Sequence, residues 1–588
     1  MPPPPAAPAD LPFGSPAKAR RYDTGRYRGA VGLNWYSCDP SLQFIVRSRL
    51  SPPALAWATP RLEEIGALMG GPVAARAEET DRNPPRLERY DRWGHDVGRV
   101  VMPPSFEASK ADLVAHSFST PAFRSSAAEA GADPNLMGAA WAYLLDQAEI
   151  GMMCALGTGG DMVVRLSEQF APEDVKARVR ELLEGNEFAG ETSQMFTERT
   201  GGSDLATLET TASPAGDAWL LNGFKWFASN ANGSVFVVLA KPVGAPDTGR
   251  GIVPFLVLRE RRDGSPNGVR IRRLKDKLGT KAVASAEVEF ADAEAFMLAP
   301  AVGGGGGQEG GDGRGLARMM ELTNGARLGI AMMGLGCARR SLVEAICYAR
   351  AREAFGAALI DQPLVQRKLA ELIVEVEAAQ ALVFDGYLGE RLRLGAPLIK
   401  LRAARLGITA ASDAIEIHGG NGYIEDWPVA RILRDAQVNT IWEGPDNILC
   451  LDVRRAVERN DAHLGLLERI RSALERGADQ PAAAAVASAA DDLAAAVDAW
   501  RTLPGPIGEA RLFDLAGFMV DVYAAALLVE QAGTEADRFG GSRKALVADL
   551  YVRRHLGPAR ADRGITRPAD DIERFKELLD GCLIDQRA

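Results

Sequence analysis

The most informative stretch of this sequence is Ile441-Trp442-Glu443-Gly444-Pro445-Asp446-Asn447, downstream of the glycine-rich run His418-Gly419-Gly420-Asn421-Gly422-Tyr423. It places one carboxylate, Glu443, between an aromatic side chain and a glycine. An apolar environment at that point would raise the pKa of the carboxyl group toward the value that a general base needs at neutral pH. A solvated loop glutamate is the alternative interpretation, and this stretch alone does not distinguish the two.

A second stretch, Phe196-Thr197-Glu198-Arg199-Thr200-Gly201-Gly202-Ser203-Asp204, opens a region of short β-type runs. Two adjacent glycines let backbone N–H groups approach a planar or anionic ligand closely, and Thr197 and Ser203 add hydroxyl donors. These properties suit the edge of a cofactor. An ordinary turn before a strand is the alternative interpretation.

A third stretch, Asn222-Gly223-Phe224-Lys225-Trp226-Phe227-Ala228-Ser229-Asn230, is a turn followed by aromatic residues and a hydroxyl. Trp226 or Phe227 would lie against a flat ring, and Ser229 would form a hydrogen bond with a ring nitrogen or oxygen. Aromatic residues beside a strand more often belong to the core, which is the alternative interpretation.

A fourth stretch, Arg350-Ala351-Arg352-Glu353-Ala354-Phe355-Gly356, is predicted as a helix end closed by its glycine. An arginine at this place can meet a pyrophosphate as a bidentate donor. Arginine is also favoured near a helix C-terminus by the helix dipole alone, so the motif by itself carries little weight.

The composition is that of a globular protein, with 47% hydrophobic and 25% charged residues, and 588 residues exceed what one hydrophobic core usually supports. A net charge of −10 argues against a broad surface for nucleic acid or anionic membrane, but it leaves room for a local basic patch. Six scattered cysteines without a Cys-x-x-Cys pair predict neither a metal site nor a disulfide framework, and they favour the cytoplasm. No uninterrupted apolar stretch of about 18 residues predicts a membrane span.

The sequence pattern divides the chain into six segments. Apolar and polar residues alternate in the third segment, which predicts an antiparallel β-domain, whereas apolar residues at three- and four-residue steps predict packed helices in the fifth. The fourth segment is glycine-rich and lacks the Gly-Lys-Ser/Thr ending of a phosphate-binding loop, so a flexible linker is favoured. The segments are a disordered leader (1–20), a helical N-terminal domain (21–185), the β-domain (186–300), the linker (301–315), a helical bundle (316–464) and an appended helical domain (465–588).

Together and in this order, the four stretches resemble the acyl-CoA dehydrogenase family, over roughly residues 140–460. Their matching features are Thr-Glu-x-x-x-Gly-Ser-Asp, Asn-Gly-x-Lys with aromatics, Arg-x-x-Phe-Gly, and Gly-Gly-Asn-Gly-Tyr followed by Trp-Glu-Gly. Within the family the chain is similar to the AidB-like branch. That similarity rests on the additional C-terminal region and on Asn83-Pro84-Pro85, Arg89-Tyr90-Asp91, 273–279, 438–444 and 447–453.

The resemblance implies an α+β fold with a helical N-terminal domain, a middle β-barrel, a C-terminal four-helix bundle and an extra helical C-terminal region. It implies FAD as the cofactor, bound between barrel and bundle near a subunit contact, in a homotetramer. It also implies an acyl-CoA substrate, with a further flavoprotein as a candidate electron acceptor, and no membrane partner.

Matched residue by residue, the resemblance assigns Glu443 as the catalytic base. Some branches of the family place a glutamate directly before the arginine that matches Arg327, but Ala326 stands there in this chain. Ser203 and Arg327 are the substrate-binding candidates. The candidate cofactor-binding residues are Phe196, Thr197, Gly202 and Ser203 beside the flavin, Phe227 and Ser229 at its ring system, Arg352 and Phe355 at the pyrophosphate and adenosine, Glu416, Gly419 and Gly420 from a neighbouring subunit, and Asp446 and Asn447 after the base.

Three departures from the family pattern concern the shape of the acyl pocket. The usual proline after Thr-Glu is Arg199, the small residue before Gly-Ser is Gly201, and the ring-facing tryptophan is replaced by Phe227. The expected reaction is nevertheless α,β-dehydrogenation of an acyl-CoA thioester, with Glu443 removing the α-proton.

A rival function from another class is a flavoprotein that binds DNA in an alkylation response, with weak or vestigial dehydrogenase activity. Residues 543–567 carry a local excess of positive charge, and such a patch would neutralise several phosphates. A plain solvated helix face is the alternative interpretation of this segment.

Overall fold

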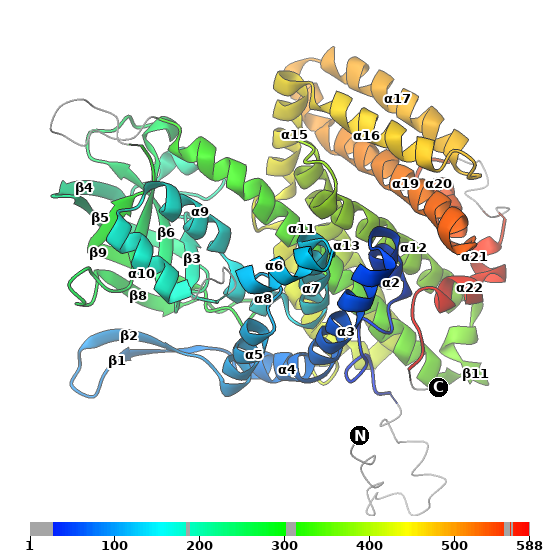
Figure 1. Cartoon of the computed structure of the whole chain (residues 1–588), viewed down its shortest axis with the longest axis horizontal. Coiled ribbons are helices and arrows are strands. Elements are labelled where there is room, and N and C mark those ends of the chain that lie inside the picture. The colour runs from blue at the N-terminus through cyan, green and yellow to red at the C-terminus, as the bar shows by residue number, and fades with distance from the viewer. Residues whose placement is uncertain (1–26, 184–188, 301–312, 558–564, 566–567, 587–588) are drawn as a thin grey trace, which may run out of the picture.

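The computed structural model describes residues 27–183, 189–300, 313–557, 565 and 568–586. A β-domain forms one end of the long axis, and helices form the remainder (Figure 1). The predicted α+β architecture is confirmed: N-terminal helices, a middle β-domain and C-terminal helices follow one another along the chain. The predicted leader and most of the glycine-rich linker lie outside the described residues.

The N-terminal domain is helical. Proline occupies the first turn of several of its helices, where its missing N–H removes no intrahelical hydrogen bond. Asp39, Thr120 and Asp133 cap three of them by accepting backbone N–H groups of the first turn. The helices are α2 (Pro40–Arg49), α3 (Pro52–Leu68), η1 (Met69–Val73), α4 (Ala74–Arg82), α5 (Pro104–Ala115), α6 (Pro121–Glu129), α7 (Pro134–Ala148), α8 (Ile150–Gly157), α9 (Gly160–Phe170) and α10 (Glu173–Leu183).

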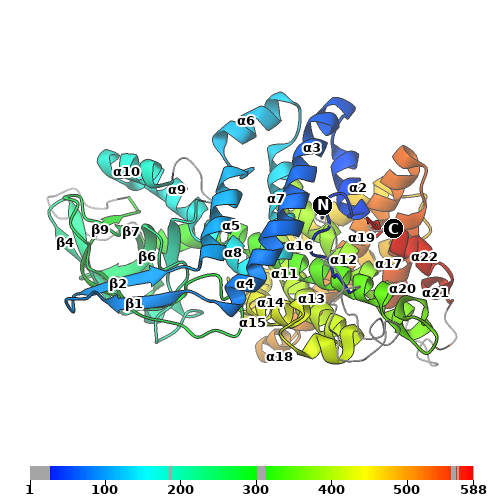
Figure 2. The same ribbon diagram turned by 90° about the horizontal axis from the view of Figure 1, so that it is seen from below.

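One hairpin leaves this domain between α4 and α5. Its antiparallel strands, β1 (Arg86–Tyr90) and β2 (Asp96–Val101), run beside the β-domain (Figure 2). Leu87 and Val100 pack against the core of the β-domain, and the tip exposes Trp93. The hairpin therefore ties the first domain to the second.

The β-domain is a barrel whose strands close into a ring. Consecutive neighbours are β6, β4, β5, β9 and β7, and β7 pairs again with β6, while β3 pairs with β6 and β8 with β9. The predicted antiparallel pairing holds for most strand pairs of this domain, but β3 and β4 both run parallel to β6. The strands are β3 (Thr192–Met195), β4 (Thr211–Ala215), β5 (Ala218–Ala228), β6 (Val235–Pro242), β7 (Val253–Leu258), β8 (Val269–Leu274) and β9 (Ala286–Met297).

A helical bundle follows the barrel and is built around the long helix α11. It packs on α13 so closely that a Cβ at Gly334 would lie 2.5 Å from the carbonyl oxygen of Ala403, so this crossing requires glycine. The elements are α11 (Gly315–Ala351), β10 (Glu353–Ala354), β11 (Ala357–Ala358), α12 (Pro363–Leu388), α13 (Gly395–His418), η5 (Gly419–Tyr423), α14 (Pro428–Ala436), η6 (Gln437–Thr440) and α15 (Asp446–Asn460).

The C-terminal region extends the same core. Its apolar residues belong to one buried cluster with those of the bundle and the N-terminal helices. Among the described residues one helix, α19, is long and apolar enough to cross a membrane, but 72% of its apolar window is buried inside the protein. The helices are α16 (Ala462–Arg476), α17 (Ala483–Arg501), α18 (Gly505–Ala510), α19 (Leu512–Phe539), α20 (Arg543–His555), α21 (Asp570–Glu573) and α22 (Phe575–Asp580).

Candidate active site

Glu443 lies within the bundle, in the turn between η6 and α15, and its side chain contacts Gln194 of the barrel strand β3. Its φ is 54°, in the left-handed region that L-residues rarely adopt, and the following Gly444 has a φ of 103°. Backbone strain of this kind persists only where the surroundings hold it, and it concentrates at functional sites. The carboxyl group is half-buried, and this burial raises its pKa above the ordinary value, against a hydrogen bond from Gln194 and the charges of Arg327 and Lys400.

Two buried cations hold the main chain of this turn. Arg327 of α11 donates from Nε to the carbonyl oxygen of Glu443 at 3.2 Å and from Nη1 to Asp452 at 2.6 Å. Lys400 of α13 donates from Nζ to the carbonyl oxygen of Gly444 at 2.7 Å. Burial lowers the pKa of Lys400 to about 8, and the ammonium remains charged at neutral pH. The turn is therefore fixed from both helices of the central crossing.

The turn at 196–204 is held by a buried ion pair. Glu198 accepts a hydrogen bond from Nζ of Lys225 at 2.6 Å and from the backbone N–H groups of Glu209 and Thr210 at 2.6 and 3.2 Å. The ion pair of Glu198 and Lys225 thus holds the turn against β5. Gly202 is required here, because a Cβ would lie 2.7 Å from Oγ1 of Thr197.

The ligand-facing candidates of this turn are the residues that the ion pair leaves accessible. Gly202 and Ser203 are exposed, whereas Phe196 and Thr197 are half-buried. The backbone N–H of Trp226 donates to the carbonyl oxygen of Thr197 at 2.8 Å, so the second and third motifs lie side by side.

On β5 the aromatic pair divides between two environments. Nζ of Lys275 lies 3.2 Å from the ring centre of Trp226, which is covered, whereas Phe227 is 51% exposed. Just beyond β5, Oγ of Ser229 lies 3.3 Å from Oγ of Ser285. Phe227 and Ser229 are therefore the groups of this motif that are open to a ring-shaped ligand.

The fourth motif differs from its predicted structure. Helix α11 ends at Ala351, before the glycine, and Arg352 is its C-cap. Phe355 and Gly356, with φ of 53° and 83°, form the tip of the β10–β11 hairpin, so the prediction that Gly356 closes the helix is wrong. Phe355 is 98% exposed, and Nη1 of Arg352 donates to the hydroxyl of Tyr27 at 3.3 Å.

The glycine-rich motif lies at the end of α13. Glu416 forms an ion pair with Lys368 at 2.7 Å, and a Cβ at Gly419 or Gly420 would meet no atom within 4 Å. The side-chain amide of Asn421 donates to the hydroxyl of Tyr348 at 3.2 Å. Because Tyr348 lies near the end of α11, this motif is beside the one that carries Arg352.

After the base, α15 begins with the two remaining candidates. Asp446 is buried and accepts a hydrogen bond from Nε of Arg405 at 2.6 Å through Oδ2, while its buried Oδ1 has no partner among the described residues. Asn447 is exposed.

The candidate residues thus form two groups in one protomer. Arg327 contacts Glu443 near the start of α11, whereas Arg352 caps its end. At 1.5 Å per residue these positions are about 37 Å apart along the helix. The sequence motifs do not meet at one place in a single copy of the chain.

Sequence reasoning missed Gln194, Lys400 and Asp452. Gln194 of β3 donates from Nε2 to Oε1 of Glu443 at 2.6 Å, across the boundary between barrel and bundle. None of the three belongs to the four motifs, although Asp452 lies in the stretch 447–453, and no local pattern links them to residue 443. The sequence offers one weak signal, since Lys400 stands between the apolar residues Ile399 and Leu401 near the start of α13.

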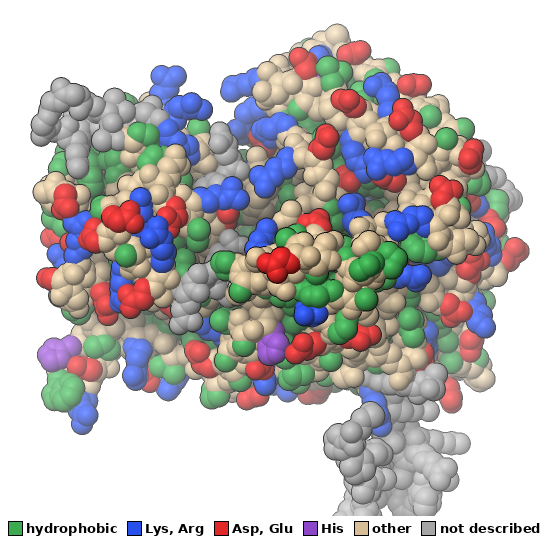
Figure 3. All heavy atoms as spheres, viewed as in Figure 1, with side chains coloured by type: hydrophobic (Ala, Val, Ile, Leu, Met, Phe, Trp, Pro, Cys, Tyr) green, Lys and Arg blue, Asp and Glu red, His purple; other side chains and the backbone are tan. Residues whose placement is uncertain are grey.

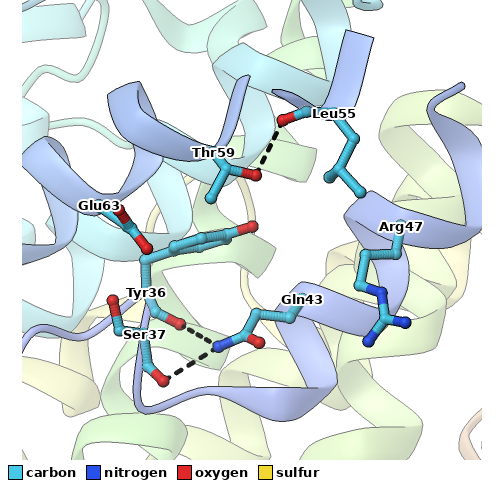
Figure 4. Close-up of a pocket in the computed structure, with 7 residues that line it drawn as sticks. All are labelled: Tyr36, Ser37, Gln43, Arg47, Leu55, Thr59 and Glu63. Carbon is cyan, nitrogen blue, oxygen red and sulfur yellow. Dashed lines mark hydrogen bonds between the residues drawn. The ribbon is translucent and has the colours of Figure 1, made fainter. Parts of the chain in front are cut away.

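Two surface hollows lie away from Glu443. One, of about 260 Å³, lies between the segment before α2, α2 itself and α3, where the amide of Gln43 donates to the carbonyl oxygens of Tyr36 and Ser37 (Figure 4). The other lies on the β1–β2 hairpin. No group of three or more metal-ligating side chains occurs within the described part of the chain.

In the described part of segment 543–567, the basic residues do not form the open patch that the excess of positive charge would allow. Lys544 is buried and Arg543 is half-buried, and both share the carboxylate of Glu377, with Lys544 Nζ at 2.8 Å. Arg553 pairs with Asp549 and Asp570, and Arg554 with Glu371 and Glu375. Arg560, Arg563 and Arg567 lie outside the described residues. The described cations of this segment are neutralised by carboxylates, several of them distant in the sequence.

Comparisons with known proteins agree with this architecture. Residues 193–293 and 313–458 match the middle and C-terminal domains of acyl-CoA dehydrogenases, and residues 28–183 match the N-terminal domain of the adaptive response protein AidB. The chain is 31% identical to the putative acyl-CoA dehydrogenase AidB of Escherichia coli, over 70% of this chain and 76% of that protein. The chain belongs to the acyl-CoA dehydrogenase family. Its N-terminal domain and this relative place it in the AidB-like branch of that family.

Other members of the acyl-CoA dehydrogenase family are similar over most of the chain. Acyl-CoA dehydrogenase family member 11 of Caenorhabditis elegans is 29% identical over 72% of this chain and 70% of that protein. The crystal structure of Caenorhabditis elegans ACDH-11 in complex with C11-CoA has a TM-score of 0.79 at 25% identity, covering 95% of this chain and 97% of that one. The structure named Bd2924 apo-form has a TM-score of 0.72 at 28% identity, covering 86% of this chain and 99% of that one. The enzyme class is therefore acyl-CoA dehydrogenase, and the cofactor of the family is FAD.

Proposed function

We propose that this protein oxidises an acyl-CoA thioester to its 2-enoyl-CoA, with Glu443 as the base and FAD as the hydride acceptor. The observation that carries the proposal is the carboxyl group of Glu443, which is held in a strained turn by donors from barrel and bundle. Burial raises its pKa toward the range in which a carboxylate accepts a proton efficiently.

In this reaction Glu443 takes the α-proton of the substrate. The Cα–H bond breaks, its electron pair forms the new double bond, and the β-hydrogen leaves with its own electron pair. Bound FAD supplies the acceptor for that hydride. Arg327 and Lys400 keep the carbonyl oxygens on either side of the turn fixed, so the carboxylate needs little reorganisation during proton transfer.

The residues present fit this cofactor. Phe227 and Phe355 expose apolar rings at the expected flavin and adenosine positions, by 51% and 98%. The open space at Gly419 and Gly420 admits a ligand against the backbone. We assign Ser203, which is exposed in the turn 196–204, to the CoA part of the substrate.

Arg327 and Arg352 are separated by about 37 Å along α11, and this distance supports a site built from two copies of the chain. We propose that Arg352 and Phe355, together with Glu416, Gly419 and Gly420, reach the FAD whose flavin lies beside Glu443 of another copy. This assignment revises the expectation that Arg352 and Phe355 act within their own subunit. We further propose that the protein is a homotetramer in the cytoplasm. A second flavoprotein would accept the electrons from the reduced FAD.

The deciding experiment replaces the carboxyl group of Glu443. Glu443→Gln keeps the shape of the side chain but cannot accept the proton, so FAD should bind while anaerobic bleaching of the flavin by acyl-CoA slows by about 10²- to 10⁴-fold. Glu468→Gln, at an exposed position on α16, is the matched control. Bleaching by Glu443→Gln at the wild-type rate, tested over a panel of acyl chain lengths, would exclude Glu443 as the base.

DNA binding in an alkylation response is a second candidate, favoured by the match of residues 28–183 to the adaptive response protein AidB. The described cations of segment 543–567 do not support it, because carboxylates neutralise them. Figure 3 shows Lys and Arg side chains gathered along the hollow between the β-domain and the helical domains. Helix α15, on the helical side of this hollow, carries the exposed residues Arg455 and Arg459. Duplex DNA retention should fall steeply between low and physiological salt if these groups contact phosphates, and Arg455→Glu should reduce it.

A further inference from the structure

Strand β3 joins the base to the other side of the candidate site. Its four residues, Thr192–Met195, pair in parallel with β6, and successive side chains of a strand point to opposite faces. Ser193 donates its hydroxyl hydrogen to the carbonyl oxygen of Ser229. Gln194, the next residue, donates from Nε2 to Oε1 of Glu443 at 2.6 Å. One short strand therefore contacts both the position expected at the flavin ring and the catalytic carboxylate.

We infer that Gln194 is the positioning residue of the base: it holds Oε1 of Glu443 and leaves Oε2 to take the α-proton. No hydrogen bond to Oε2 occurs in the described parts of the chain, whereas Oε1 has a short, side-chain-to-side-chain partner. The carboxylate turns about the bonds of a flexible side chain unless a second contact fixes it. The amide of Gln194 supplies that contact from a rigid strand.

The inference rests on the proposed function, because it assigns roles to the oxygens of the proposed base. It adds a residue outside the four sequence motifs, and it explains how barrel and bundle are aligned at the reacting atoms. The hydrogen bonds at Ser193 and Gln194 keep Ser229 and Glu443 at a constant separation, although they belong to different domains.

A donor on Oε1 also stabilises the charged form of Glu443. Arg327 from α11 and Lys400 from α13 add positive charge, and the thiol of Cys154 on α8 is a further titratable neighbour. The two cations act on the main-chain carbonyls, so Gln194 is the group that touches the carboxylate itself. Removing its amide should raise the pKa of Glu443, and the pH at which the base becomes active should rise with it.

Two substitutions test this assignment. Gln194→Met has a similar length and no donor, so the midpoint of the pH profile for anaerobic flavin bleaching should move up by about one pH unit or more. At a fixed pH below the midpoint, the rate should be about tenfold lower for each pH unit by which the midpoint has risen, with the high-pH plateau retained. Gln194→Glu puts a second carboxyl group against the first, and because the pair shares one proton the midpoint should rise further.

A second measurement needs no turnover. Infrared spectra of protein labelled with ¹³C-glutamate, taken as differences from Glu443→Gln, follow the protonation of Glu443 directly. Gln169→Met, at an exposed position on α9, is the matched control and should leave the titration unchanged. An unchanged or lower titration midpoint in both Gln194 variants would overturn the inference. Failure of the proposed function is distinguishable, since it would appear as undiminished bleaching by Glu443→Gln.

Discussion

A buried carboxyl group in the helical core offers a sharp test of the packing. Asp146, near the end of α7, is 2% exposed, and neither of its oxygens has a hydrogen-bond partner among the described residues. It faces α11 at Gly336, where a Cβ would lie 2.5 Å from the Cβ of Asp146. Burial raises the pKa of Asp146 well above its usual value, so the folded protein keeps this group protonated where the unfolded chain does not.

The effect on stability follows from proton linkage. The folded state binds more protons than the unfolded state at this site, so the free energy of unfolding falls as pH rises above the unfolded-state pKa of about 3.9. Asp146→Asn has nearly the same shape and no proton to retain. Its advantage over the wild type should therefore grow by about 1.4 kcal/mol per pH unit, for as long as the native carboxyl stays protonated.

Hydrogen exchange of peptides from α7 measures the local free energy of opening around Asp146. A local measurement is needed because a chain with several domains does not unfold in one step. After correction for intrinsic rates, exchange in Asp146→Asn should slow relative to the wild type by about tenfold per pH unit. Asp580→Asn, at an exposed position on α22, should show no such trend. A difference between Asp146→Asn and the wild type that stays constant from pH 5 to pH 7 would refute the reasoning.

Two further predictions concern the motifs. Lys225→Met leaves the buried carboxylate of Glu198 without its ammonium partner, so the free energy of unfolding of the barrel should fall by about 3 to 5 kcal/mol. Hydrogen exchange in residues 196–204 should become faster. Unchanged exchange would contradict the structural role of this pair. Phe355→Ser removes an apolar ring that is 98% exposed in one protomer, so the helical content and far-ultraviolet spectrum should persist while FAD affinity and assembly size fall. Flavin titration measures the FAD affinity, and light scattering measures the mass of the assembly. Wild-type values for both quantities would argue against a site shared between copies of the chain.

The resemblance of the four motifs, taken in order, to the acyl-CoA dehydrogenase family was enough to predict the fold, and two of these motifs also carry local constraints that the structure uses. Gly202 fits tightly against Thr197, and the Glu198–Lys225 pair joins two motifs that are separate in the sequence. Such constraints combine glycine geometry with charge. They therefore leave a signature that survives in the sequence alone.

The contacts that sequence reasoning missed are those that depend on distant partners. Gln194 meets Glu443 only because the barrel packs on the bundle, and nothing near residue 194 indicates a base. The charge count of 543–567 could not decide between its two interpretations for the same reason, since Glu377 on α12 forms ion pairs with Arg543 and Lys544 from far along the chain. The hairpin at Phe355 consists of strands of two residues each, too short for any periodic pattern to reveal.

Residues 582–584 pack against α11 and against the segment that precedes α2. Nη2 of Arg339 donates to the carbonyl oxygen of Cys582 at 2.8 Å, and the backbone N–H of Ile584 donates to the carbonyl oxygen of Cys38 at 3.1 Å. The N-terminal helices are synthesised well before residues 582–584, so this packing layer can form only late in folding. A variant shortened before Cys582 would leave the buried guanidinium group of Arg339 without its partners at Cys582.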